Sequence, residues 1–111
     1  MPPTTDVTTR TSKPCEGGTP PMSAAEVETQ LHDVPGWALV DGRLERAYPF
    51  RNYYETMAFV NVVAWVANRE GHHPVLEVGV RQCRVSYWTR AIDGLSENDF
   101  ICAAKLNQLV G

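Results

Sequence analysis

Two adjacent histidines, His72 and His73, are the residues of this sequence whose type and spacing best suit chemistry. Gly71 before them allows a helix to end and Pro74 after them prevents its continuation, so the pair is expected on a rigid turn. Imidazole titrates near neutrality, and two imidazoles held on such a turn could move protons in a dehydration, where a hydroxyl leaves as water. Adjacent histidines at a helix end also serve simply as caps or solvated side chains, so the pair alone leaves both interpretations open.

A metal site is not predicted. His32 is the one other histidine in the sequence, no cysteine lies beside the pair, and zinc needs three or four convergent ligands. The three cysteines, Cys15, Cys83 and Cys102, are odd in number and form no CxxC motif. This pattern argues against a disulfide framework and favours a reducing cytoplasm.

The elements that must position the histidines follow from hydrophobic periodicity and from start and stop signals. Capping boxes that pair Ser23 with Glu26 and Ser96 with Asp99 predict the starts of two helices, and the dipeptide at 41–42 predicts a tight hairpin turn. The expected elements are a helix over 23–32, strands over 37–40 and 43–48, a helix over 52–69, strands over 76–80 and 82–89, and a helix from 96 to the end. The sequence thus predicts an α+β fold of order α-β-β-α-β-β-α, with a four-stranded antiparallel sheet and helices packed on one face.

The helix expected over 52–69 is apolar on more than one side. One face would carry Tyr53, Met57, Val60, Ala64 and Ala67, and a second Phe59, Val62, Val63 and Val66. Such a helix is either deeply buried or shared with another subunit, and a chain of 111 residues is too small to wrap it fully. A homo-oligomer, in its simplest form a dimer, is therefore expected.

Composition excludes two classes of partner. The net charge is −3 without a run of Lys or Arg, which argues against nucleic acid, and no apolar run has the ~18 residues that a membrane span needs. Residues 1–21 are rich in Thr, Pro and Gly and are predicted to be a flexible tail, with one domain over 22–111.

Several separated motifs together resemble the pterin-4a-carbinolamine dehydratase family. They are His72-His73-Pro74, then Thr89, then Gly94-Leu95-Ser96 with Asp99. The resemblance implies dehydration of a 4a-hydroxytetrahydropterin, such as 4a-hydroxytetrahydrobiopterin, without metal or organic cofactor, by a dimer or tetramer. It implies catalytic roles for His72 and His73, and ligand-binding roles for Pro74, Thr89 and Asp99.

Three positions depart from the family pattern. Asn68 stands where an acidic residue is usual, Val80 where an aromatic residue lines the pocket, and Arg90 where a further catalytic histidine usually follows Thr89. A guanidinium stays protonated and cannot act as a base, and loss of a general acid or base typically costs about 10²–10⁴ in rate. Glu70, near Asn68 on the same helix, could supply the missing carboxylate and bind the ligand.

Two functional hypotheses follow. The first is a non-catalytic scaffold that binds a protein client. The sequence is similar to the branch of the family that assembles Rubisco in the α-carboxysome, through the Leu76-Glu77-Val78-Gly79 run and the segment over 98–105. The implied client is Rubisco, and the implied location is a bacterial cytoplasm, in association with carboxysomes. Trp88 and Arg90 would share one side of their strand if it stays regular, and are candidate partner-binding residues.

The second hypothesis is a working 4a-hydroxytetrahydrobiopterin dehydratase, a lyase that binds pterin. His72, His73 and the complete final motif favour this activity, whereas Asn68, Val80 and Arg90 oppose it.

Overall fold

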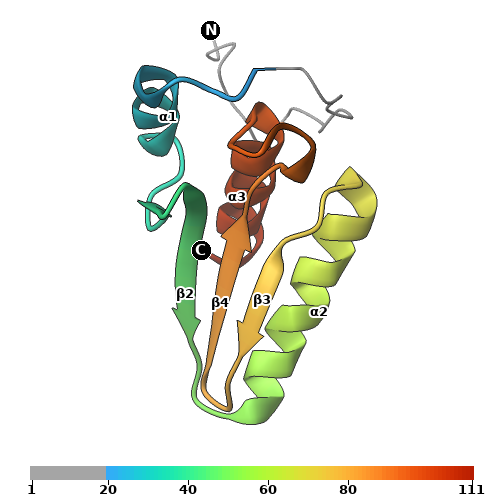
Figure 1. Cartoon of the computed structure of the whole chain (residues 1–111). Helices are drawn as coiled ribbons and strands as arrows, with labels where there is room; N and C mark the ends of the chain where they lie inside the picture. The colour runs from blue at the N-terminus through green and yellow to red at the C-terminus, as the bar shows by residue number, and fades with distance from the viewer. Residues whose placement is uncertain (1–19) are drawn as a thin grey trace, which may run out of the picture.

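A computed structural model describes residues 20–111, and the helices and strands alternate as the sequence predicts (Figure 1). The elements are α1 (Ala24–Leu31), β1 (Ala38–Val40), β2 (Arg43–Pro49), α2 (Tyr53–Glu70), β3 (Val75–Val78), β4 (Gln82–Tyr87), a short 3-10 helix η2 (Arg90–Ile92) and α3 (Glu97–Val110). The predicted tail over 1–21 lies outside the described residues except for Pro20 and Pro21, so it stays a prediction.

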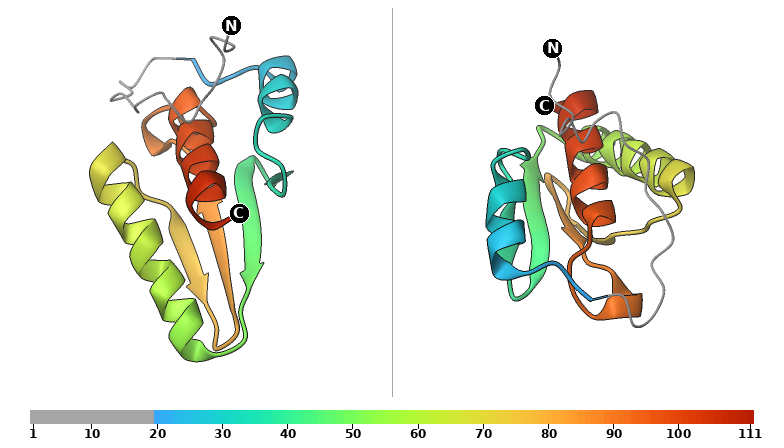
Figure 2. Two further views of the ribbon diagram at one scale, coloured as in Figure 1. Left: turned by 180° about the vertical axis from the view of Figure 1, so that it is seen from behind. Right: turned by 90° about the horizontal axis from the view of Figure 1, so that it is seen from above.

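The four strands form one antiparallel sheet in the order β1-β2-β4-β3. Helices α2 and α3 lie against one face of this sheet, α1 lies beside the β1–β2 end, and the opposite face is open (Figure 2). The α+β prediction is therefore confirmed, including the tight turn between β1 and β2. Asp41 and Gly42 adopt φ values of 50° and 78°, the positive pair that a two-residue hairpin requires.

The core lies between the sheet and helices α2 and α3. Alternate residues of β2 and β4 point into it, among them Leu44, Tyr48, Val85 and Tyr87, each buried. Helix α2 contributes Phe59, Val63 and Val66, which belong to the second of its two predicted apolar faces. The other face leaves Tyr53 exposed by 54%, and Tyr54 and Trp65 are exposed as well. That exposure agrees with the expected oligomer, which remains a prediction.

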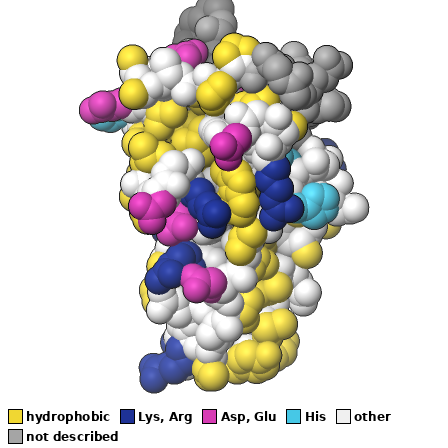
Figure 3. Space-filling view, in the orientation of Figure 1, with side chains coloured by type: hydrophobic (Ala, Val, Ile, Leu, Met, Phe, Trp, Pro, Cys, Tyr) yellow, Lys and Arg dark blue, Asp and Glu magenta, His cyan; other side chains and the backbone are white. Residues whose placement is uncertain are grey.

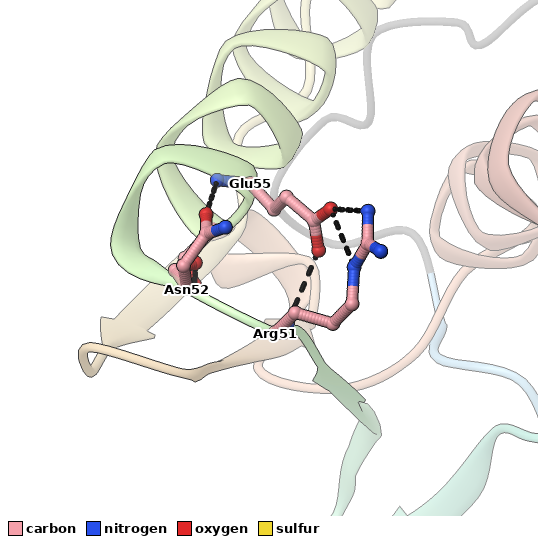
Figure 4. A network of polar contacts seen from close by, with 4 residues as sticks. Arg51, Asn52 and Glu55 are labelled. Atoms are coloured by element: carbon pink, nitrogen blue, oxygen red, sulfur yellow. Dashed lines mark hydrogen bonds and ion pairs between the residues drawn. The ribbon is translucent and has the colours of Figure 1, made fainter.

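The start of α2 is fixed by side chains of its own first turn (Figure 4). The Asn52 side chain accepts a hydrogen bond from the backbone N–H of Glu55 at 2.8 Å, as an N-cap residue does. The Glu55 carboxylate accepts in turn from the backbone N–H and the guanidinium of Arg51, and these bonds lower the pKa of Glu55. These contacts hold the first turn of α2, and the histidines follow the other end of this helix.

Two strands, β3 and β4, end earlier in the structure than the periodicity of the sequence predicted. Strand β3 stops at Val78 because Gly79 turns the chain back, its N–H bonding to the Gln82 carbonyl at 2.8 Å. Strand β4 stops at Tyr87 because Thr89 and Gly94 exchange two backbone hydrogen bonds, which close a loop that contains η2. Arg90 thus opens a short helix instead of extending the strand.

The buried thiol of Cys102 on α3 makes stability sensitive to alkaline pH. Burial raises the pKa of this thiol to about 12, and the carboxylates of Glu70 and Asp99 add to the rise. In an unfolded chain a thiol has a pKa of about 8.5. Between these two values only the unfolded chain loses the proton, so the free energy of unfolding should fall as pH rises. For this thiol the loss should reach about 2.5 kcal/mol near pH 10.5.

Urea unfolding of the parent and of a Cys102→Ala variant, each near pH 8 and near pH 10.5, measures this contribution. The variant should lose less stability between the two pH values than the parent does. It keeps part of the alkaline loss, because burial also raises the pKa of Tyr87. Equal losses in the two proteins would show that the Cys102 thiol does not titrate between the folded and unfolded states as expected.

Candidate functional site

The histidine pair lies where α2 ends and before β3 begins. Gly71 caps the helix with a φ of 64°, and the backbone N–H of His72 still bonds to the Ala67 carbonyl at 3.2 Å. Pro74 then leads the chain into β3. The predicted rigid turn is therefore present, and it presents His72 and His73 with different surroundings.

His72 is held on two sides. Its Nε2 lies 2.6 Å from Oδ1 of Asp99, and its ring stacks on that of Tyr87 with centroids 5.9 Å apart and an interplanar angle of 10°. Only 12% of its side chain is exposed. With an ionised Asp99 carboxylate, Nε2 must carry the hydrogen, and the neutral ring keeps Nδ1 as its acceptor. The ring is therefore oriented as a positioned base would be.

Asp99 is fully buried and connects three elements of the site. Its Oδ2 accepts from the Thr89 hydroxyl at 2.9 Å and from the backbone N–H of Ser96 at 2.9 Å. The hydroxyls of Thr89 and Ser96 lie 2.6 Å apart. The capping box that starts α3 thus also fixes His72, and Ser96 joins the site although its sequence motif indicated only a cap.

A hollow of about 270 Å³ opens beside this network. It is lined by Gly71, His72, His73, Trp88, Thr89, Arg90, Ala91 and Asn98. His73 is exposed at its rim, and the Arg90 guanidinium carbon lies 5.0 Å from the centroid of the Trp88 ring. Trp88 and Arg90 therefore come together as expected, although the loop after β4, and not a regular strand, brings them there.

Other residues named from the sequence lie elsewhere. Glu70 is buried with its carboxylate 3.3 Å from Lys105 of α3, and it is not among the residues that line the hollow. Val80 lies in the β3–β4 turn, 64% exposed, at the other end of the sheet from the histidines. Asn68 is exposed on α2. Of the three departures from the family pattern, Asn68, Val80 and Arg90, it is Arg90 that lines the hollow of its own chain.

Neither a metal cluster nor a membrane span is present in residues 20–111. This part of the chain holds no group of three or more His, Cys, Asp or Glu side chains that could bind a metal ion. Its helices are too short or too polar to cross a membrane.

The fold and site together define a small α+β domain in which a buried aspartate holds a histidine at the edge of an open hollow. Residues 20–109 match the family model described as pterin 4 alpha carbinolamine dehydratase, so the chain belongs to that family. It is 57% identical over 106 residues to a protein of Nitrosomonas eutropha named "Putative pterin-4-alpha-carbinolamine dehydratase", covering 95% of this chain and 94% of the relative.

Two solved structures share the fold. The crystal structure of a transcriptional coactivator/pterin dehydratase from Brucella melitensis superposes with a TM-score of 0.77 at 25% identity, covering 82% of this chain and 99% of that one. A pterin dehydratase-like protein identified as a RuBisCO assembly factor in the alpha-carboxysome superposes with a TM-score of 0.58 at 22% identity, covering 72% of this chain and 95% of that one. At that identity the second likeness shows the fold alone.

Proposed function

We propose that this protein works by binding a protein client and does not turn over the 4a-carbinolamine. The observation that supports this most directly is the position of Arg90, which lines the hollow together with His72 and His73. Dehydration of the carbinolamine needs one group to protonate the leaving hydroxyl and another to take a proton from the ring N–H. The guanidinium of Arg90, which stands where the family usually has a further catalytic histidine, can stabilise an anion but cannot accept that proton.

Rubisco is the first candidate client, and an assembly or chaperone role in the α-carboxysome is the corresponding function. The proposal rests on the motif resemblance of the strand β3 run and the start of α3 to that branch of the family. The fold shared with the solved assembly factor is compatible with it. The exposed aromatic residues of α2, Tyr53, Tyr54 and Trp65, support a homodimer as the working form.

The direct test is dehydration of 4a-carbinolamine by the purified full chain, beside an active dehydratase of the family. We expect no rate above the uncatalysed background from a folded oligomer. Turnover near that of the active enzyme would overturn the proposal. Binding of purified Rubisco, measured in the same preparation by native mass spectrometry, then tests the client. A folded chain that neither reacts nor binds Rubisco would remove Rubisco as the client.

The second candidate is a working 4a-hydroxytetrahydrobiopterin dehydratase, and one observation favours it. The contact of 2.6 Å between His72 and Asp99, with Thr89 behind it, keeps an oriented imidazole at the edge of the hollow. His73, exposed beside it, could serve as the second proton-transfer group. The same dehydration assay decides between the two candidates.

A further inference from the structure

We infer that Arg43, Trp88 and Arg90 form a receptor for a carboxylate-bearing, acidic segment of a protein partner. These three residues are called the arginine–tryptophan cluster below. The inference rests on the proposed function, because it names the chemistry by which a client would be recognised.

The cluster is built by strand register. Leu44 of β2 pairs with Tyr87 of β4, and continuing the register by one residue places Arg43 opposite Trp88. Leu44 and Tyr87 are buried against the helices, so Arg43 and Trp88 face the open side of the sheet. The guanidinium carbon of Arg43 lies 3.9 Å from the centroid of the Trp88 ring. Arg90 reaches the same ring from η2, at 5.0 Å.

Two positive charges are therefore held close together on one indole. Both guanidinium carbons lie near the same ring centroid, so they are less than about 9 Å apart. Among the ion pairs formed within residues 20–111, none includes Arg43 or Arg90, whereas Arg51 pairs with Glu55 and Arg84 pairs with Glu77. Like charges repel at this separation, and a bound anion would relieve the repulsion.

The neighbouring acid offsets only part of the positive charge, because a single carboxylate stands beside two guanidinium groups. Glu45 lies two residues from Arg43 on the same face of β2, and its carboxylate accepts a hydrogen bond from the Ser86 hydroxyl at 2.7 Å. The chain as a whole carries a net charge of −3. Figure 3 shows Lys or Arg side chains and a histidine on this face beside a band of hydrophobic atoms, with acidic side chains above and to one side. The cluster is thus a local positive site on an acidic protein.

The chemistry of the three side chains selects a carboxylate. A guanidinium presents a planar fork of donors that fits the two oxygens of a carboxylate, and the half-buried indole gives the stem of an acidic side chain an apolar surface along its exposed part. The cluster lies on an open sheet face beside the mouth of the hollow, so an extended peptide can reach it. A long polyanion such as nucleic acid is disfavoured, because two arginines on a chain of charge −3 offer too few phosphate contacts.

The test is an NMR titration of the ¹⁵N-labelled full chain at low ionic strength with acetyl-pentaglutamate amide, and with acetyl-pentaglutamine amide as the neutral control. The sequence has three tryptophans, so the indole N–H signals of Trp37, Trp65 and Trp88 can be followed separately. We expect pentaglutamate to shift the Trp88 signal saturably and the Trp65 signal little, with pentaglutamine producing no such shift. Because each guanidinium would make a charge-assisted bond, Arg43→Gln and Arg90→Gln should each weaken binding about tenfold.

Two variants calibrate the effect of charge. Arg81→Gln removes one positive charge from the β3–β4 turn, at the far end of the sheet, and should leave the affinity within about twofold because salt screens distant charges. Glu45→Gln removes the neighbouring carboxylate and should tighten binding. Retained signal dispersion in each variant shows that the fold persists.

Several outcomes would overturn the inference. They are equal weakening by Arg81→Gln and Arg90→Gln, equal binding of pentaglutamine, saturation of the same signals by free glutamate at the same concentration, or tighter binding of a twelve-nucleotide single-stranded DNA. The result is separable from the fate of the proposed function. A chain that dehydrates the carbinolamine and still binds pentaglutamate through both arginines would refute the non-catalytic proposal alone. A chain that does neither would refute the acidic-segment receptor alone.

Discussion

An Arg90→His variant should dehydrate the 4a-carbinolamine about 10²- to 10⁴-fold faster than the parent chain, the range that a positioned acid or base usually contributes. The substitution places a group that exchanges protons at a position lining the same hollow as His72 and His73. The backbone there is fixed by the hydrogen bonds between Thr89 and Gly94, so the new imidazole should start from the same point on the loop. Initial rates at equal protein concentration are corrected for the uncatalysed reaction, and because the parent should stay at that background, the detection limit for the parent sets the lower bound of the ratio.

Arg90→Gln is the matched control, because it removes the same positive charge without adding a base. This control should stay at the rate of the parent. If Arg90→Gln gains as much as Arg90→His, the arginine suppresses activity by its charge, and the missing base is not the cause. If neither variant gains, the loss of activity must lie elsewhere, and the role assigned to position 90 is wrong.

Most of the fold could be predicted because its signals are local. The capping boxes of α1 and α3, the turn at Asp41 and Gly42, and the exit of α2 at Gly71 each depend on a few neighbouring residues, and all four are present. The end of β4 could not be predicted in this way. The bonds that stop it join Thr89 to Gly94 across a loop, and periodicity along a strand carries no information about such a closure.

The site was predictable in part, for similar reasons. The family resemblance named His72, Thr89 and Asp99 together, but the hydrogen bonds that join them depend on the packed fold. Glu70 shows that a residue close to the histidines in sequence need not lie in the hollow beside them. It lies three residues after Ala67 and four after Val66, both buried, so the helical period turns it toward α3 and Lys105. The same periodicity, applied to that one residue, would have placed it correctly.

Val80 illustrates a different limit. Its position after the histidines suggested a place in the pocket, yet β3 runs away from the turn at His73 for four residues before Val80 is reached. At about 3.3 Å per residue this carries the chain more than 10 Å from the histidines. Arg43 is the converse case, because its contact with Trp88 depends on the pairing of β2 with β4. Contacts between strands become visible only once the register is known.

Replacing Asp99 by asparagine should lower the free energy of unfolding by about 3 kcal/mol, a large share of the stability of a small domain. The Asp99 carboxylate is fully buried and accepts from His72, Thr89 and the backbone of Ser96, at 2.6 Å, 2.9 Å and 2.9 Å. An amide of the same shape keeps one acceptor oxygen and turns an N–H₂ group toward donors on the other side. At least one buried donor then loses its partner, and that loss, not a change of volume, is what destabilises the fold.

Glu97→Gln serves as the control for charge, because Glu97 is an exposed residue of the same first turn of α3. It removes one negative charge near the same helix N-terminus and should cost less than about 1 kcal/mol. Urea unfolding of the three proteins gives the comparison, and the ¹⁵N shifts of the His72 imidazole give a second readout that a general loss of stability would not produce. In the parent the hydrogen should reside on Nε2, and Asp99→Asn should change that preference. Equal destabilisation by the two substitutions, with an unchanged imidazole, would mean that helix-terminal charge and not the buried network holds His72 in place.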